Sequence, residues 1–187
     1  MADGLRPAPF DVVEASRRVW VERWDDDAAS GNAVFTAVLR AHQMLMQQVD
    51  AVMKRHDLTF TRYQVLAWLA AEPETARALS WISTVLRVPP ATVTNIIDRL
   101  ESDDMVRRVA HPTDARTTLA ELTDLGREVA HDTTVDLNDE VYRPLALGDA
   151  DRGQLIDLLG SLRANGGEFD VERSAELMDR LGAQRTV

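Results

Sequence analysis

The chain has 187 residues, of which 45% are hydrophobic and 28% are charged, and its net charge at pH 7 is −10. This length and composition fit one globular domain with a real core, and no apolar run reaches the roughly 18 residues that a membrane span needs. The absence of cysteine excludes disulfides, thiolate metal sites and cysteine redox sensing. The N-terminus lacks the apolar core of a secretory signal, so we expect a cytoplasmic protein without a membrane partner.

Two helices are predicted in the first third of the chain. Residues 10–28 have apolar side chains at helical spacing, and the acidic and small residues that follow predict a turn. Residues 32–56 form a longer helix that is apolar on more than one side, which indicates a second subunit as an additional partner. The candidate interface residues on this helix are Val38, His42 and Leu45. Near a two-fold axis His42 could meet its mate and confer acid sensitivity, or it could be an ordinary hydrogen-bonded interface histidine.

Three shorter helices follow. Residues 61–72 form one, capped by Thr61, and Ser80 caps the next over residues 79–88. Arg87 lies at the break after it, where a positive φ would be unusual for a residue other than glycine. Pro90 suits the first turn of a new helix over residues 90–104. Apolar side chains predicted to face the core are Val65, Leu66, Trp68 and Leu69 of the first helix, and Val93, Ile96, Ile97 and Leu100 of the last.

After these helices the spacing of apolar residues changes from the helical period to that of β-strands. Residues 105–110 and 117–122 read as two strands joined by a turn over residues 111–116, which makes a β-hairpin next to a helix-turn-helix. Thr123 caps a long helix that runs to Pro144, and residues 149–164 form another, with Leu155 and Leu159 on its apolar side. The tail over residues 168–187 holds one short helix with Val171, Ala175, Met178 and Leu181 at helical spacing. The predicted fold is therefore mainly α with a small β-hairpin wing (α+β).

The acidic charge is unevenly distributed. Residues 77–118 contain six arginines and five acids, a net charge of +1, which leaves −11 for the rest of the chain. An acidic remainder would disfavour non-specific DNA binding and sharpen discrimination, or it could serve solubility alone.

Three motifs in order resemble the MarR family of winged helix-turn-helix transcription regulators. They are V-x-P-x-T-V-T-x-x-x-D-R-L-E at residues 88–101, D-x-R at Asp114 and Arg116, and L-T-x-x-G-R at residues 122–127. The resemblance covers roughly residues 30–165. It implies a helical dimerisation region at residues 31–58 and 124–165, in which the winged helix-turn-helix of residues 59–123 is embedded. Residues 1–30 would be an extra helix packed on the dimer core, and residues 166–187 a tail.

The resemblance implies a homodimer that binds an inverted repeat in double-stranded DNA, with repression as the usual mode. Arginine pairs with guanine and asparagine with adenine in the major groove, threonine touches a thymine methyl or a phosphate, and a wing arginine suits the minor groove. We expect Asp114 to pair in part with Arg116 and to fix its direction. The expected DNA-binding residues are Pro90, Thr92, Thr94, Asn95, Arg99, Arg108, Asp114 and Arg116.

The N-terminal helix with Trp20 and Trp24 resembles the urate-responsive branch of that family, whose members use an acid and an arginine where this chain has Gln64 and Asn95. Neutral amides can hydrogen-bond a ligand but do not neutralise an anion. The resemblance implies a small aromatic or anionic effector that releases the DNA. The candidate ligand-binding residues are Trp20, Trp24, Gln64, Trp68, Asn95 and Arg107, and core packing is the alternative for the tryptophans.

Other functions fit less well. The chain lacks a G-x-S-x-G nucleophile motif and a phosphate-binding glycine loop, so we expect no enzyme and no cofactor. The four histidines share no metal-ligand spacing, and we assign no metal residues, although a zinc-responsive regulator of the same fold stays open. A winged helix that binds protein rather than DNA is the remaining alternative.

Overall fold

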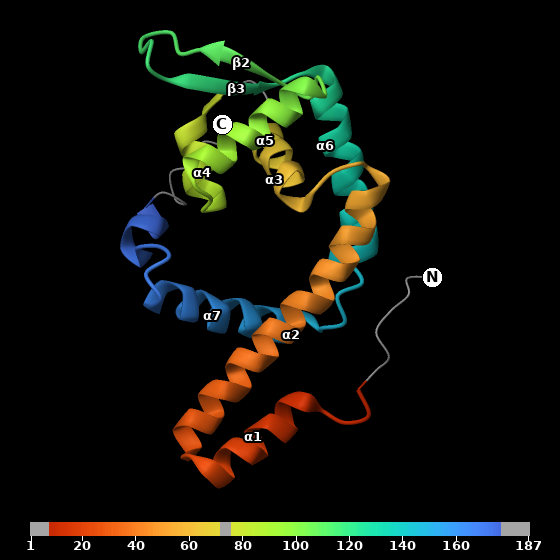
Figure 1. Ribbon diagram of the computed structural model, residues 1–187, viewed down its shortest axis with the longest axis vertical. Coiled ribbons are helices and arrows are strands. Elements are labelled where there is room, and N and C mark those ends of the chain that lie inside the picture. Colours follow the sequence, from red (N-terminus) through yellow and green to blue (C-terminus); the bar gives the residue numbers. More distant parts are fainter. Residues whose placement is uncertain (1–7, 72–75, 177–187) are drawn as a thin grey trace. The chain divides into compact units, whose positions relative to one another are not determined.

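The computed structural model describes residues 8–71 and 76–176. The chain forms two compact units that divide after Pro144, and each is described by itself below. The first unit carries the helices and the small sheet drawn from red to cyan in Figure 1. Its elements are α1 (Val12–Arg23), α2 (Asp26–Arg55), α3 (Phe60–Ala70), β1 (Arg77–Ala78), α4 (Leu79–Leu86), α5 (Pro90–Ser102), β2 (Val106–Ala110), β3 (Thr118–Leu122), α6 (Asp124–Leu137) and the π-helical turn η1 (Asn138–Tyr142).

A turn separates the first two helices, but it is confined to Trp24 and Asp25, so its predicted extent was wrong. Helix α1 ends at Arg23, and the acidic and small residues after it form the first turns of α2 rather than a loop. The carboxylate of Asp25 accepts the backbone N–H of Ala28 at 2.8 Å, and Asp26 and Asp27 lie in the first turn. Negative side chains at the N-terminus stabilise a helix, because they accept hydrogen bonds from its free N–H groups and interact favourably with the positive end of its dipole. Helix α1 packs along α2.

Two predicted caps were also wrong. Helix α3 is capped by Thr59, whose hydroxyl accepts the N–H of Arg62, and not by Thr61. Helix α4 begins after Ala78 without a side-chain cap, so Ser80 lies inside the helix. The predicted core position of Trp68 is wrong as well, because its side chain is 48% exposed. It makes an edge-to-face contact with Trp81 of α4, with ring centroids 6.0 Å apart.

The break between α4 and α5 is tight, as the sequence predicts. Arg87 adopts the left-handed region at φ 53° and ψ 41°. The hydroxyl of Ser83 donates to the carbonyl of Val88 at 2.7 Å, and the N–H of Val88 donates back to the carbonyl of Ser83 at 3.2 Å. Helix α5 then begins at Pro90, which needs no N–H partner in a first helical turn.

The wing is part of a three-stranded antiparallel sheet of order β1-β3-β2. The predicted hairpin is present, with Val106 opposite Leu122 and Ala110 opposite Thr118. The two-residue strand β1, which the sequence pattern does not indicate, pairs with the other edge of β3.

The start of α6 is fixed by Thr123 and Gly126. The hydroxyl of Thr123 accepts the N–H of Gly126 at 3.0 Å, which confirms the predicted cap, and donates to the carbonyl of Asp104 at 2.6 Å. A Cβ on Gly126 would lie 1.9 Å from the carbonyl oxygen of Met105, so this position has room for glycine alone. Thr123 and Gly126, the threonine and the glycine of the L-T-x-x-G-R motif, thus hold α6 against the base of the wing.

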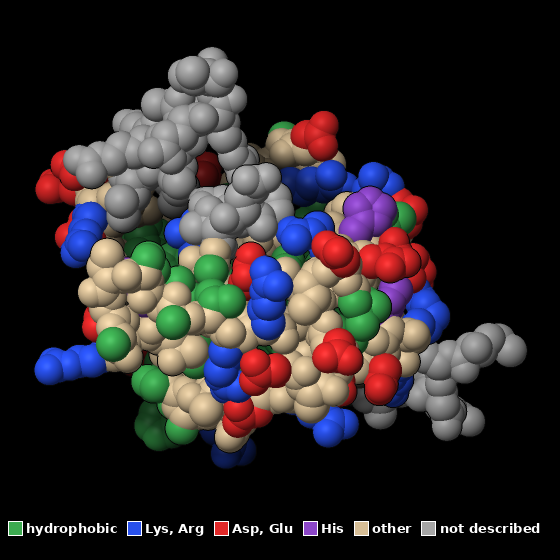
Figure 2. All heavy atoms as spheres, turned by 90° about the horizontal axis from the view of Figure 1, so that it is seen from above, with side chains coloured by type: hydrophobic (Ala, Val, Ile, Leu, Met, Phe, Trp, Pro, Cys, Tyr) green, Lys and Arg blue, Asp and Glu red, His purple; other side chains and the backbone are tan. Residues whose placement is uncertain are grey.

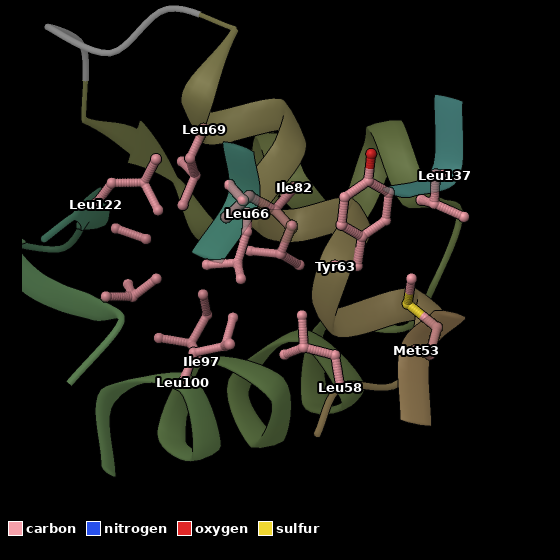
Figure 3. Close-up of a cluster of buried hydrophobic side chains, with 14 of the residues drawn as sticks. Met53, Leu58, Tyr63, Leu66, Leu69, Ile82, Ile97, Leu100, Leu122 and Leu137 are labelled. Atoms are coloured by element: carbon pink, nitrogen blue, oxygen red, sulfur yellow. The ribbon is translucent and has the colours of Figure 1, made fainter. Parts of the chain in front are cut away.

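One hydrophobic core joins α2, α3, α4, α5, β3 and α6 (Figure 3). The predicted core residues Val65, Leu66 and Leu69 of α3, and Val93, Ile97 and Leu100 of α5, are buried in it, while Ile96 is half-buried. The C-terminal end of α2 contributes Val49, Val52 and Met53. The core therefore holds α5 by its apolar face and leaves its opposite face on the surface.

The second unit contains α7 (Asp149–Asn165), which agrees closely with the predicted helix over residues 149–164. Residues 171–176 are also helical, as expected for the tail, whereas Met178 and Leu181 lie outside the described residues. No described residue of α7 is buried, although Leu155, Ile156, Leu158 and Leu162 are aliphatic.

Candidate nucleic-acid interface

The outer face of α5 presents polar side chains on a helix whose apolar face is buried in the core. Thr92, Thr94, Asn95 and Arg99 are all exposed, whereas Val93, Ile97 and Leu100 between them are buried. The spacing of three and four residues that buries the apolar set places the polar set on the other side. Donors and acceptors for base edges are thus carried on one exposed helix that begins at Pro90.

Arg99 is the basic residue of this face, with 70% of its side chain exposed. It has a loose ion pair with Asp103, one helical turn further on, at 3.9 Å. Asp103 is engaged more closely by Arg62 of α3, a side chain that is only 13% exposed. Because Asp103 is held mainly by Arg62, the Arg99 guanidinium stays available to a partner.

Arg108 lies on β2 and connects the wing to α5. Its guanidinium donates to Asp98 at 2.6 Å and also to Glu101, and its backbone N–H donates to Glu101 at 3.0 Å. The side chain is 27% exposed. The structure therefore gives this predicted DNA contact an internal role: Arg108 fixes the wing on α5 and neutralises two carboxylates of that helix.

Asp114 organises the wing tip through the backbone rather than through the Arg116 guanidinium. One carboxylate oxygen accepts the N–H of Arg116 at 3.0 Å, and the other accepts the hydroxyl of Thr117 at 2.7 Å. These hydrogen bonds lower the pKa of Asp114, the Thr117 hydroxyl most and the Arg116 amide next. The expected ion pair with the Arg116 side chain is not found among the described residues, and Arg116 is exposed at the tip.

A residue that the sequence analysis missed also lies at this tip. The Nδ1 atom of His111 accepts the backbone N–H groups of Asp114 at 3.1 Å and of Thr113 at 3.3 Å. A histidine that caps a loop leaves no periodic signal in a sequence, so only the turn itself could be predicted.

Basic and acidic side chains are interspersed on the face of the molecule shown in Figure 2, without one continuous patch of Lys and Arg. Arg107 of β2, a candidate ligand residue, is paired across the sheet with Glu121 of β3 at 2.8 Å. The Glu121 hydrogen bond raises the pKa of Arg107, and the Arg107 hydrogen bond lowers the pKa of Glu121. Attraction of DNA would thus depend on single exposed arginines more than on net charge.

The candidate ligand residues are spread over four elements. Trp20 belongs to α1 and Trp24 follows the last residue of that helix, Gln64 and Trp68 share one side of α3, Asn95 lies on α5 and Arg107 on β2. Trp24 is 69% exposed and Trp20 is 37% exposed. Within the described part of the chain, no hydrogen bond or ring contact joins any two of the six residues.

The candidate interface stripe on α2 is open in the single chain. Val38 and His42 are exposed and Leu45 is half-buried, and on α7 Leu155 is exposed and Leu159 half-buried. No helix among the described residues has the length and apolar character needed to cross a membrane. The same residues contain no group of three histidines or acids that could hold a metal ion.

Comparisons with known proteins agree with this geometry. Residues 56–117 match the MarR family. Sco5413, a MarR family transcriptional regulator from Streptomyces coelicolor, is 36% identical, with a TM-score of 0.66 over 75% of this chain and 98% of its own.

Two further relatives are regulators. The HTH-type transcriptional regulator MhqR of Bacillus subtilis is 24% identical over 80% of this chain and 89% of its own. The transcriptional repressor CouR, solved bound to a 23-mer DNA duplex, is 25% identical, with a TM-score of 0.62 over 67% of this chain and 89% of its own. The urate-responsive branch suggested by the N-terminal helix is not confirmed by these matches. The chain belongs to the MarR family of DNA-binding transcriptional regulators, which are not enzymes.

Proposed function

We propose that the chain is a homodimeric repressor that binds an inverted-repeat operator and releases it when a small aromatic or anionic molecule binds. The observation that carries this proposal is the orientation of α5, whose apolar face is buried in the core while its polar face is exposed beside the wing. CouR, a repressor of similar fold, is solved on a DNA duplex.

The exposed face of α5 would read the major groove. Asn95 is suited to adenine and Arg99 to guanine, and Thr92 and Thr94 to a thymine methyl or a phosphate. Arg116 at the wing tip would enter an adjacent minor groove, where negative potential is highest when the groove is narrow.

Two copies of the winged helix-turn-helix are needed for a long operator, because one copy contacts only a short half-site. The unburied aliphatic side chains of α2 and α7 support a second copy as their partner, since monomers rarely leave such faces in water. Two-fold symmetry would set the two copies of α5 about 34 Å apart, one turn of B-form DNA.

The DNA proposal is tested by footprinting and gel shift on the DNA upstream of the gene. We expect two symmetric protected half-sites and a loss of about 1–3 kcal/mol for Arg99→Ala. Arg143→Ala is the matched control, because Arg143 is 71% exposed and pairs with an acid one turn away, as Arg99 does, but lies beyond α6. A single asymmetric half-site, or equal losses for both variants, would contradict the proposal.

The dimer proposal is tested by light scattering. We expect Val38→Glu on α2 to shift the chain toward the monomer, because a charge in an apolar interface is costly. Leu125→Glu is the control, since Leu125 is similarly exposed but lies at the start of α6 (44% against 41% for Val38). A monomeric wild type would contradict the proposal.

Ligand control is supported by the exposed tryptophans and is tested by their fluorescence. Aromatic acids and purines are titrated into the protein and into Trp68→Phe, and the same compounds are added to the gel shift. Ligand binding releases DNA only if the ligand binds more tightly to a dimer whose two α5 helices have a spacing that does not fit the operator. A panel that changes neither the fluorescence nor the DNA affinity would contradict this part of the proposal.

A further inference from the structure

The loop at the tip of the wing is built around the imidazole of His111. Its Nδ1 atom accepts two backbone N–H groups, those of Asp114 and Thr113, and lies 3.4 Å from the Thr113 hydroxyl. Backbone amides can only donate, so Nδ1 must present a lone pair. This geometry requires a neutral ring that carries its proton on Nε2.

The same loop presents Arg116. Asp114, whose N–H is held by His111, accepts the N–H groups of Arg116 through its carboxylate and of Thr117 through its carbonyl, the latter at 3.1 Å. The N–H of His111 donates to the carbonyl of Thr117 at 3.4 Å and closes the loop. Residues 112–116 are exposed, so hydrogen bonds rather than core contacts order this segment.

We propose that His111 is the positioning residue of the wing, and that its protonation releases the loop and weakens the hold of Arg116 on DNA. A proton on Nδ1 would point at two N–H donors, and the cap would have to break. This inference rests on the proposed function in one respect, namely that the wing contacts the operator.

The charged residue in contact with His111 is Asp114. Asp114 would attract a protonated ring, but both of its carboxylate oxygens already accept hydrogen bonds from Arg116 and Thr117. An imidazolium that turned toward Asp114 would draw the carboxylate away from those donors. Thr117, whose carbonyl accepts the N–H of His111, is uncharged.

Three variants separate capping from charge. His111→Asn keeps an acceptor for the amides two and three residues further on, as in an Asx turn, but does not titrate. His111→Ala removes the acceptor, and His111→Lys removes it while adding a permanent positive charge. If positive charge alone mattered, the lysine variant would bind DNA more tightly than wild type.

Affinity for the duplex upstream of the gene is measured by fluorescence anisotropy between about pH 5 and 8, where histidine changes its charge. At the upper end we expect His111→Asn to bind within about twofold of wild type, and His111→Ala and His111→Lys roughly tenfold more weakly, as for loss of one ordered contact. As the pH falls, wild type should lose roughly tenfold in affinity relative to His111→Asn. Parallel pH profiles for these two proteins, or tight binding by His111→Lys, would overturn the proposal.

A second readout does not depend on DNA. The ¹⁵N shifts of the His111 ring in the full-length chain, assigned by comparison with His111→Asn, should show an unprotonated Nδ1 at about pH 8. The opposite tautomer would overturn the proposal even if the operator is bound. Failure of wild type to bind the duplex at any pH would instead overturn the proposed function, and the tautomer would still report the cap.

Discussion

Arg108 of β2 donates to Asp98 of α5 at 2.6 Å, so the wing and the helix that faces DNA are joined by a direct ion pair. Arg108 therefore differs from Arg116, which is exposed at the wing tip. We expect Arg116→Ala to lower the salt dependence of DNA binding by about one counterion, as for loss of a phosphate contact. Arg108→Ala should weaken binding without lowering that slope, because it leaves Asp98 and Glu101 unpaired near the DNA.

The measurement is the logarithm of the binding constant against the logarithm of salt concentration for wild type and both variants. Arg108→Ala should also lower the free energy of unfolding by about 1–2 kcal/mol, because a partly buried, doubly hydrogen-bonded guanidinium is lost. Equal reductions of the salt slope for the two variants would restore Arg108 as a phosphate contact.

Arg87 occupies the left-handed region at the turn between α4 and α5. This conformation costs about 1–2 kcal/mol for a residue with a Cβ and almost nothing for glycine. Arg87→Gly should therefore raise the free energy of unfolding by roughly 0.5–1 kcal/mol, after the greater entropy of glycine in the unfolded chain is subtracted. Urea unfolding checks this, and a decrease would mean that the side-chain interactions of Arg87 outweigh the strain.

The elements that the sequence predicted well have local determinants. Pro90 can begin a helix but not continue one, and Thr123 is followed by a complete helical pattern, so both starts are in the right place. The acidic run after Trp24 was misread, because the same residues favour a turn and an N-terminal helical turn. The strand β1 has two residues, and no pattern that short distinguishes a strand from a loop.

Acid should destabilise the junction of α2 with α6. The Nε2 atom of His56 donates to the carboxylate of Asp136 at 2.8 Å, and Arg55 donates to the same carboxylate at 3.2 Å. These contacts lower the pKa of Asp136, that with His56 most and that with Arg55 next. A carboxyl whose pKa is lower in the folded state stabilises it above the unfolded value, and this stabilisation is lost as the pH falls through the folded pKa.

The free energy of unfolding should therefore fall below about pH 4, where a free aspartate begins to take up protons. Asp136→Asn should be less stable than wild type at neutral pH and should lose less stability on acidification. Asp50→Asn, which changes an exposed carboxyl of α2, is the control. An identical loss of unfolding free energy on acidification for wild type and Asp136→Asn would contradict this assignment.

The candidate site was predicted unevenly for a physical reason. The exposed side chains of α5 follow from helical periodicity, so the outward position of Thr92, Asn95 and Arg99 could be predicted. The roles of Arg108 and His111 depend on which hydrogen bonds form across a turn or between a strand and a helix. Residue type gives each of them several partners, and only the fold selects among these.

Gly126 should tolerate no side chain, because its Cβ would lie 1.9 Å from the carbonyl oxygen of Met105 and 2.8 Å from the carbon of that group. These are backbone atoms at the junction of α5 and β2, so relief would require α6 to move away from the wing. Gly126→Ala should lower the free energy of unfolding by about 1–3 kcal/mol or more. Gly31→Ala is the matched control, since Gly31 also lies in a helix, but an added Cβ there would have no heavy atom within 4 Å apart from its chain neighbours and the backbone of its own helix.

The control should gain roughly 0.5–1 kcal/mol, because alanine is the better helix former. Both variants are compared with wild type by urea unfolding, and the affinity for DNA is measured in parallel. Because Thr123 and Gly126 together hold α6 at the base of the wing, Gly126→Ala should also weaken DNA binding. A Gly126→Ala protein as stable as the Gly31→Ala protein would show that the close approach to Met105 is not required by the fold.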